Sequence, residues 1–328
     1  MGKRELVFNA FDNKKTERVP VGFWYHFAPD ALFENSEETL QRNINGHQKF
    51  FDSFQPDFLK LMSDGYFYYD NETVKNIKSA KDLEQVQAVG VEAWIDAQVE
   101  LVKELTRRFG SEVATFYNIF APATFFKFIL EANHLPFTLA DLLKENPEGV
   151  AHALNEIAKD IAVLAEKVIT EGKADGIYLS VQNVQDKEIT KEIYLKYVAP
   201  SEKQVLAAAQ AVSEYNILHI CGYEGSKNDL STYVDYDAKI INWAVVVEGV
   251  PLEEGKKLFG GRAVIGGFDN TENGVLYKGT KAEIESYTEK LLTGAGTTGV
   301  ILGADCTIPS DTPHEHLEWV REKAKSFS

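Results

Sequence analysis

The sequence predicts an α/β protein folded as a single-domain (β/α)8 TIM barrel over residues 1–328. Short runs of apolar, β-branched or aromatic residues alternate with longer segments of helical periodicity, and eight such units can be counted. Strands that alternate with helices require crossover connections, so they form a parallel sheet that is buried on both faces. No proline- or serine-rich linker divides the chain, which favours one domain. An open, doubly wound sheet is the alternative.

The predicted elements follow one another along the whole chain. The eight strands are expected at residues 19–25, 57–63, 112–120, 175–181, 216–222, 239–248, 262–268 and 299–305. The clearest helices are expected at 91–110, which ends at a glycine, at 146–172, which has Pro147 near its start, and at 280–296. Residues 64–92 are longer than a plain connection, and we expect them to form an insertion over the barrel mouth.

Charge and composition exclude several classes of partner. The formal net charge is -16, from 50 acidic and 34 basic side chains, which would repel a nucleic-acid backbone or an anionic membrane surface. The chain has no apolar run of about 18 residues that could span a membrane, and its N-terminus lacks the apolar core of a signal peptide. With two cysteines and no disulfide framework, we expect a soluble protein of the reducing cytoplasm.

One histidine and both cysteines form the strongest candidate site. His219 and Cys221 are two residues apart on a predicted strand, so their side chains point to the same side. Cys306 ends the eighth predicted strand, and the carboxyl ends of all barrel strands meet at one face. A His, Cys, Cys set suits zinc and leaves a fourth position open for water or substrate. The alternative is that 219–221 is simply a buried strand, where cysteine behaves as a small hydrophobe.

Further candidates lie at the ends of other predicted strands. A carboxylate from Glu248 or Asp305 could be a fourth zinc ligand, and water is an equal alternative. Asp305 could instead accept a hydrogen bond from His219 or from a backbone amide. His26 could approach the mouth, although a lone histidine is more often a local hydrogen-bonding residue. Three polar residues could act on or orient a substrate, although such residues often serve turns: Asp64, Tyr117 and Gln182.

At the H-x-C pattern of His219 and Cys221, with Cys306 far along the chain, the sequence resembles the uroporphyrinogen decarboxylase superfamily. It is most similar to the branch of zinc-dependent, corrinoid-linked methyltransferases that methylate thiols. Similar segments extend over nearly the whole chain, namely ERVPVGFW, NIFAPATFFKFIL, ADGIYLSVQ, RAVIGGFDN and GADCTIPSDTPHEHL. The resemblance implies that His219, Cys221 and Cys306 bind Zn²⁺.

The resemblance also implies a reaction. Zinc would bind a small thiol substrate and lower its pKa, so that the thiolate attacks a methyl group. The implied donor is methylcobalamin on a separate corrinoid protein, because the sequence shows no B12-binding segment of its own. The aromatic residues of the 64–92 insertion could form part of the surface that receives this partner. The resemblance leaves the identity of the thiol open.

Two other functions are compatible with the same fold. The decarboxylase branch carries arginines after its first strand that grip porphyrin carboxylates, whereas this chain has GFWYHFAPD there. A decarboxylase of another carboxylated substrate would use Asp64, which resembles that branch's central carboxylate. A third alternative is a protein that binds a corrinoid protein or zinc without turnover.

Overall fold

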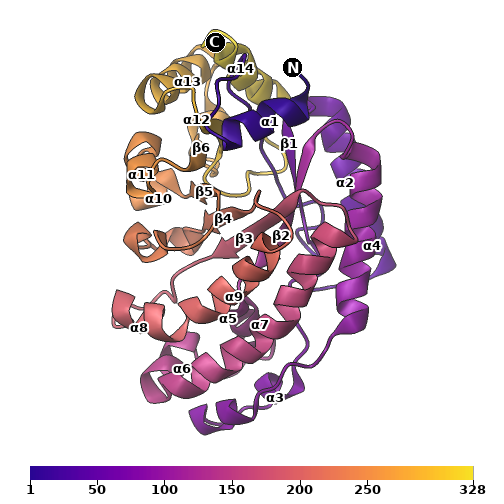
Figure 1. The fold of residues 1–328 in the computed structure, drawn as a ribbon, viewed down its shortest axis with the longest axis vertical. Coiled ribbons are helices and arrows are strands. Elements are labelled where there is room, and N and C mark those ends of the chain that lie inside the picture. Colours follow the sequence, from indigo (N-terminus) through magenta and orange to yellow (C-terminus); the bar gives the residue numbers. More distant parts are fainter. Residues whose placement is uncertain (328) are drawn as a thin grey trace.

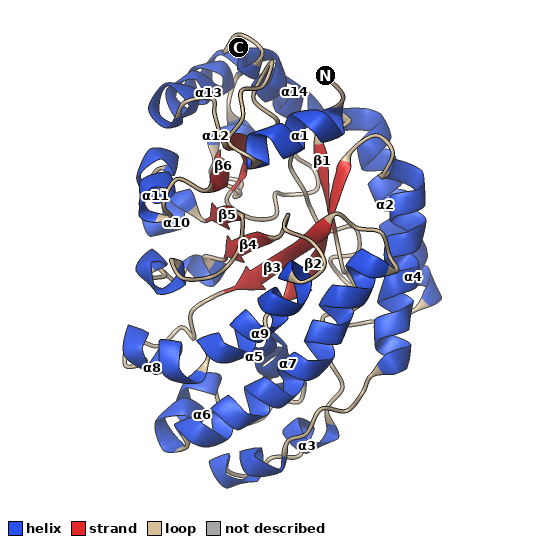
Figure 2. Ribbon diagram, viewed as in Figure 1, coloured by secondary structure: helices blue, strands red, loops and turns tan. Residues whose placement is uncertain are grey.

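Seven parallel strands form one curled sheet in the computed structural model, which describes residues 1–327 (Figures 1 and 2). Strands that are consecutive in the sequence are neighbours in the sheet, and each neighbouring pair is parallel. This arrangement confirms the predicted parallel α/β barrel. The strands are β1 (Phe58–Leu61), β2 (Ala114–Phe120), β3 (Gly176–Val181), β4 (Ile217–Ile220), β5 (Ile240–Trp243), β6 (Ala263–Phe268) and β7 (Val300–Ala304).

Helices cover the outer side of the sheet, and both chain ends lie at the same end of the molecule (Figure 1). The three clearest predicted helices are confirmed as α4, α7 and α13. None of the helices within residues 1–327 is long and apolar enough to cross a lipid bilayer. The α-helices are α1 (Lys3–Phe11), α2 (Glu37–Phe54), α3 (Glu72–Lys75), α4 (Glu92–Phe109), α5 (Pro122–Ala132), α6 (Leu139–Glu145), α7 (Pro147–Thr170), α8 (Lys191–Tyr197), α9 (Ala199–Gln210), α10 (Val245–Glu248), α11 (Leu252–Leu258), α12 (Val275–Lys278), α13 (Lys281–Ala295) and α14 (His314–Ala324).

The first of the eight predicted strands closes the sheet without forming a regular strand. Val21 makes a single parallel bridge to Leu302 of β7. The amide of Gly22 donates to the Leu302 carbonyl at 3.0 Å, and the Leu302 amide donates to the Pro20 carbonyl at 2.9 Å. On the other side, the amide of Asp57 donates to the Val21 carbonyl at 3.0 Å. The segment therefore joins β7 to β1, and a longer ladder is prevented at Pro20 because proline has no N–H.

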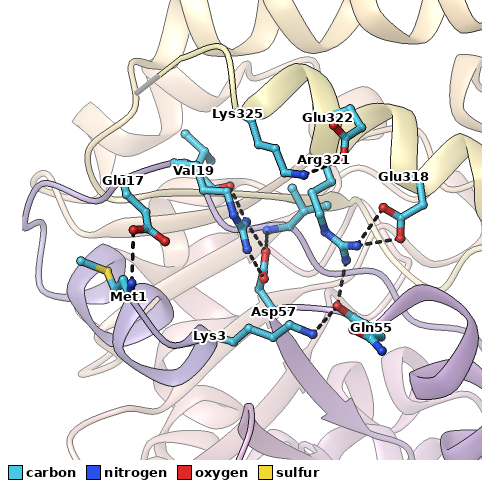
Figure 3. Close-up of polar contacts among 12 residues, drawn as sticks. Met1, Lys3, Glu17, Val19, Gln55, Asp57, Glu318, Arg321, Glu322 and Lys325 are labelled. Carbon is cyan, nitrogen blue, oxygen red and sulfur yellow. Dashed lines mark hydrogen bonds and ion pairs between the residues drawn. The ribbon is translucent and has the colours of Figure 1, made fainter.

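A buried ion pair anchors this closing segment. Both terminal guanidinium nitrogens of Arg18 donate to the carboxylate of Asp57 at 2.6 Å. Asp57 is fully buried and also accepts a hydrogen bond of 2.8 Å from the Val21 amide. Figure 3 shows Asp57 and Val19 beside Arg321 of α14. The pair thus fixes the chain at the junction between the first turn of the barrel and its last helix.

The barrel interior has its own apolar cluster, separate from the larger one between the strands and the outer helices. Alternate residues of each strand point inward. Three residues of α1 join this inner cluster and close the end of the barrel at which the strands begin: Val7, Ala10 and Phe11. The remaining members include Trp24, Phe58, Met62, Phe116, Tyr178, Ile217, Ile240, Ile265 and Ile301.

The predicted insertion divides into two parts. Phe67 lines a cavity at the barrel mouth. The rest, which contains α3 and a 3-10 helix (Ala80–Gln85), runs to α7, where Asp160 accepts hydrogen bonds from the Tyr69 hydroxyl at 2.6 Å and the Val89 amide at 2.9 Å. A role of this segment in receiving a partner stays a prediction.

We expect Asp57→Asn to lower the free energy of unfolding by about 3 kcal/mol, because it leaves the partly buried Arg18 guanidinium without its counter-ion. Urea unfolding followed by circular dichroism measures this change. Asp30→Asn is the matched control, since Asp30 forms an exposed ion pair with Arg42 and its loss should change little. Equal effects of the two substitutions would contradict a special role for the buried pair.

Candidate metal centre

Three side chains converge at the carboxyl ends of the strands. His219 lies on β4, Cys221 follows that strand, and Cys306 follows β7. The two sulfur atoms are 3.9 Å apart, and Cys306 Sγ lies 3.5 Å from His219 Nε2. All three ligand atoms lie within 4.8 Å of one another, and both cysteines are free thiols. Within residues 1–327 this is the one cluster of His, Cys, Asp and Glu side chains with such spacing.

These distances suit a tetrahedral zinc ion. With Zn–S bonds of about 2.3 Å and Zn–N bonds of about 2.0 to 2.1 Å, tetrahedral angles place two sulfurs about 3.8 Å apart and sulfur about 3.6 Å from nitrogen. The observed separations of 3.9 and 3.5 Å agree with both values. The three residues could therefore hold one ion and leave its fourth position open.

Backbone hydrogen bonds at the strand ends position the cluster. The amide of Cys221 donates to the Val181 carbonyl at 2.8 Å, which extends the β3–β4 ladder beyond the end of β4. The residue before Cys306 donates its amide to the Phe268 carbonyl at 2.8 Å and so ties the end of β7 to β6. His219 and Cys221 share one side of their strand because they are two residues apart.

Asn242 of β5 orients the imidazole of His219. Its Oδ1 accepts hydrogen bonds from His219 Nδ1 and, at 3.0 Å, from the Tyr178 hydroxyl. Its Nδ2 donates to the Ile265 carbonyl at 2.9 Å, which fixes the orientation of the amide. The Nδ1 of His219 must therefore carry the proton, and Nε2 is left free to bind a metal. The sequence analysis did not identify Asn242.

The two thiols affect each other in the metal-free site. The hydrogen bond with Cys306 raises the pKa of Cys221 well above its ordinary value, and burial adds to the rise. The same hydrogen bond lowers the pKa of Cys306, helped by His219 against the effect of burial. The pair thus holds one proton in common, and a cation that replaces this proton would bind both sulfurs as thiolates.

The structure places neither predicted carboxylate in the cluster. Glu248 lies on α10, because β5 ends before the predicted strand does, and both its oxygens accept hydrogen bonds of 2.7 Å from Asn228. Asn228 in turn donates to the Cys221 carbonyl at 3.0 Å. Asp305 accepts a hydrogen bond of 2.7 Å from the amide of Val246 and not from His219. Burial raises the pKa of Asp305 to about 8.

The expected role of Tyr117 at the barrel mouth is wrong. Tyr117 points outward from β2, is completely buried, and donates its hydroxyl proton to Gln98 of α4 at 2.9 Å. The inward positions of this strand belong to Phe116 and Asn118, of which Asn118 lines the cavity. Gln182 lies as expected at the mouth, where it lines the cavity close to Thr124.

A cavity of about 260 Å³ opens beside the three ligand atoms. Its outer wall is aromatic, with Phe67, Phe120 and Phe128 packed against one another. Polar side chains line its inner part, beside the three candidate ligands. These polar residues are His26, Lys60, Asn118, Ser180 and Gln182.

Asp64 reaches this cavity only through His26. The carboxylate accepts hydrogen bonds from His26 Nδ1 at 2.7 Å and from the amides of Phe27 and Ala28 at 2.7 and 2.9 Å. Burial disfavours its charge, but the hydrogen bonds outweigh burial and hold the pKa of Asp64 below its ordinary value. An ionised Asp64 accepts the Nδ1 proton of His26, so the Nε2 of His26 can accept a proton in the cavity.

Residues 69–327 match the family model described as uroporphyrinogen decarboxylase (URO-D). The chain belongs to this family. Two curated relatives are named methylcobamide:CoM methyltransferase MtbA, from Methanosarcina mazei and Methanosarcina acetivorans. Each is 24% identical, over 262 and 261 residues, and the matches cover 77% and 76% of this chain and 70% of each relative.

The fold of this family member is shared with a solved methyltransferase from Methanosarcina mazei, with a TM-score of 0.72. The match covers 100% of this chain and 99% of that protein, at 13% identity. The resemblance drawn from the H-x-C pattern is thereby confirmed at the level of the family, and its curated relatives are methyltransferases of the corrinoid-to-thiol type.

We expect Asn242→Leu to weaken zinc binding by roughly ten- to a hundredfold, because His219 loses the acceptor that fixes its Nδ1 proton. Asn242→Asp keeps an acceptor oxygen and should retain most of the affinity. Competition with a chromogenic chelator measures both constants. Equal affinities in the Leu and Asp variants would show that the imidazole is held in place by other contacts.

Proposed function

We propose that this protein is a zinc-dependent methyltransferase that moves a methyl group from methylcobalamin, carried by a separate corrinoid protein, to a small thiol. The observation that carries the proposal is the spacing of His219, Cys221 and Cys306, which matches tetrahedral zinc with one open position. The names of the curated relatives, methylcobamide:CoM methyltransferases, support both the donor and the thiol acceptor.

Zinc would be held by His219 Nε2 and by the sulfurs of Cys221 and Cys306, and when bound it supplies the positive charge that lowers the pKa of a substrate thiol. The proton of that thiol passes to Nε2 of His26, which lines the same cavity. Asp64 is a positioning residue in this scheme, since it holds the Nδ1 proton of His26. The substrate sulfur is then a thiolate at neutral pH.

The transfer itself balances without a further reactant. The thiolate sulfur forms a bond to the methyl carbon while the cobalt–carbon bond of methylcobalamin breaks. Cobalt keeps the electron pair of that bond and leaves as cob(I)alamin on its own protein. The aromatic wall of Phe67, Phe120 and Phe128 limits water beside the thiolate and faces the side from which the large donor must come.

Two features favour this function over the alternatives. Both oxygens of Asp64 are engaged by His26 and by backbone amides, so this carboxylate is poorly placed to stabilise a substrate cation, as a decarboxylase would require. Free thiols at the proposed zinc site suit a reducing compartment, and we therefore propose a cytoplasmic location.

We expect the purified protein to contain about one zinc ion per chain, and His219→Ala, Cys221→Ser and Cys306→Ser each to remove it. Elemental analysis measures the metal. Thiol methylation with free methylcobalamin, followed by the loss of its methyl–cobalt absorbance, should disappear in the same three variants. His134→Asn is the control, because His134 is exposed and outside the cluster. A metal-free protein that cannot be loaded with zinc would refute the proposal.

We expect His26→Gln to slow thiol methylation on the order of a hundredfold at neutral pH while leaving the zinc content unchanged. The variant should recover as the pH rises, because hydroxide can then remove the thiol proton that His26 would have accepted. Rates measured from pH 6 to about pH 10 in variant and parent test this expectation. A constant ratio of the two rates across this range would show that His26 is not the proton acceptor.

A further inference from the structure

The cavity contains a buried cation that the proposed zinc chemistry does not use. Lys60 lies in the middle of β1, is only 5% exposed, and lines the cavity together with the three candidate zinc ligands. Its ammonium group lies over two aromatic rings, 4.2 Å from the centre of Tyr178 and 5.2 Å from that of Trp24. Aromatic faces attract a cation, but they supply no strong hydrogen-bond acceptors for its three N–H groups.

No carboxylate offsets this charge within the part of the chain that the structure describes. Glu131 is the one acidic residue among those that line the cavity, and it faces Lys127 at 3.7 Å. Asp64 is within electrostatic reach of Lys60, but its oxygens accept hydrogen bonds from His26 and two amides. A buried charge without a counter-ion is costly, and proteins normally pair such a charge.

Zinc would not supply the missing counter-ion. The two positive charges of the ion are balanced by the thiolates of Cys221 and Cys306, so the loaded cluster is neutral. Lys60 then keeps its charge inside a cavity that has room for a small molecule. An anion that enters with the substrate would provide both the negative charge and the acceptor oxygens that the ammonium group lacks.

We propose that Lys60 binds an anionic group of the acceptor, and that the acceptor is therefore a short thiol that carries a carboxylate or a sulfonate. This inference rests on the proposed thiol methyl transfer. The sulfur is held at the metal cluster, and the anionic end extends toward β1, on which Lys60 lies. Two contacts at opposite ends of a short molecule would orient its sulfur toward the mouth, where the donor arrives.

The test compares two thiols of the same length, 3-mercaptopropionate and its uncharged analogue 3-mercaptopropionamide. Isothermal titration calorimetry on the zinc-loaded protein gives the dissociation constant of each. We expect the carboxylate to bind on the order of ten- to a hundredfold more tightly than the amide, as for hydrogen bonds to charged groups. Lys60→Met should abolish this preference, while the amide binds as before.

Lys127→Met is the matched control, because it removes the same charge from the rim, where Lys127 donates to Gln185 at 2.6 Å. This variant should keep the preference for the carboxylate. Lys60→Met should also unfold at the same temperature as the parent or a higher one, since a side chain of similar size replaces a buried charge. That measurement separates a specific loss of binding from a loss of fold.

The remaining outcomes each decide the question. A preference for the carboxylate that persists in Lys60→Met would overturn the inference. Equal weakening of both thiols in that variant would also overturn it, since the charge would then act on the sulfur and not on the tail. Failure of both thiols to bind the zinc-loaded parent would refute the proposed function itself, and the inference with it.

Discussion

The inward alternation of side chains in a closed parallel barrel decides which residues can reach the site. His219 pairs in register with Asn242 on one side and Ser180 on the other, so these three polar residues project into the barrel from adjacent strands. The hydrogen bond that fixes the His219 tautomer is therefore a consequence of strand register. A slip of one residue in β4 would turn His219 and Cys221 outward together and remove both from the cluster.

The local sequence was sufficient to predict the three candidate ligands, because it states both the two-residue spacing of His219 and Cys221 and the position of Cys306 at a strand end. It was insufficient for Tyr117 and Asn242. Strand β2 is buried on both faces, so its residues show no alternation that separates Tyr117 from Asn118. The pairing of Asn242 with His219 depends on register between two strands, which no local pattern encodes.

Two other differences have local causes. The run 239–248 is apolar almost throughout, and periodicity alone does not distinguish a buried strand from a strand followed by a short helix, so Glu248 was placed at a strand end. The segment around Pro20 was predicted as a strand from its apolar residues, yet proline limits its ladder. Lys60 carried an available signal, since a lysine inside the apolar run 58–62 is exceptional among buried strand residues.

An acidic protein can still select an anionic substrate, because net charge and local charge act at different ranges. The net charge of -16 belongs mostly to exposed side chains, and salt screens them beyond about 8 Å at physiological ionic strength. Lys60 lies inside the barrel, where water and salt do not screen it in the same way. A substrate anion therefore meets weak repulsion outside and a strong, directional attraction inside, which favours small anions that fit the cavity over polyanions that remain on the surface.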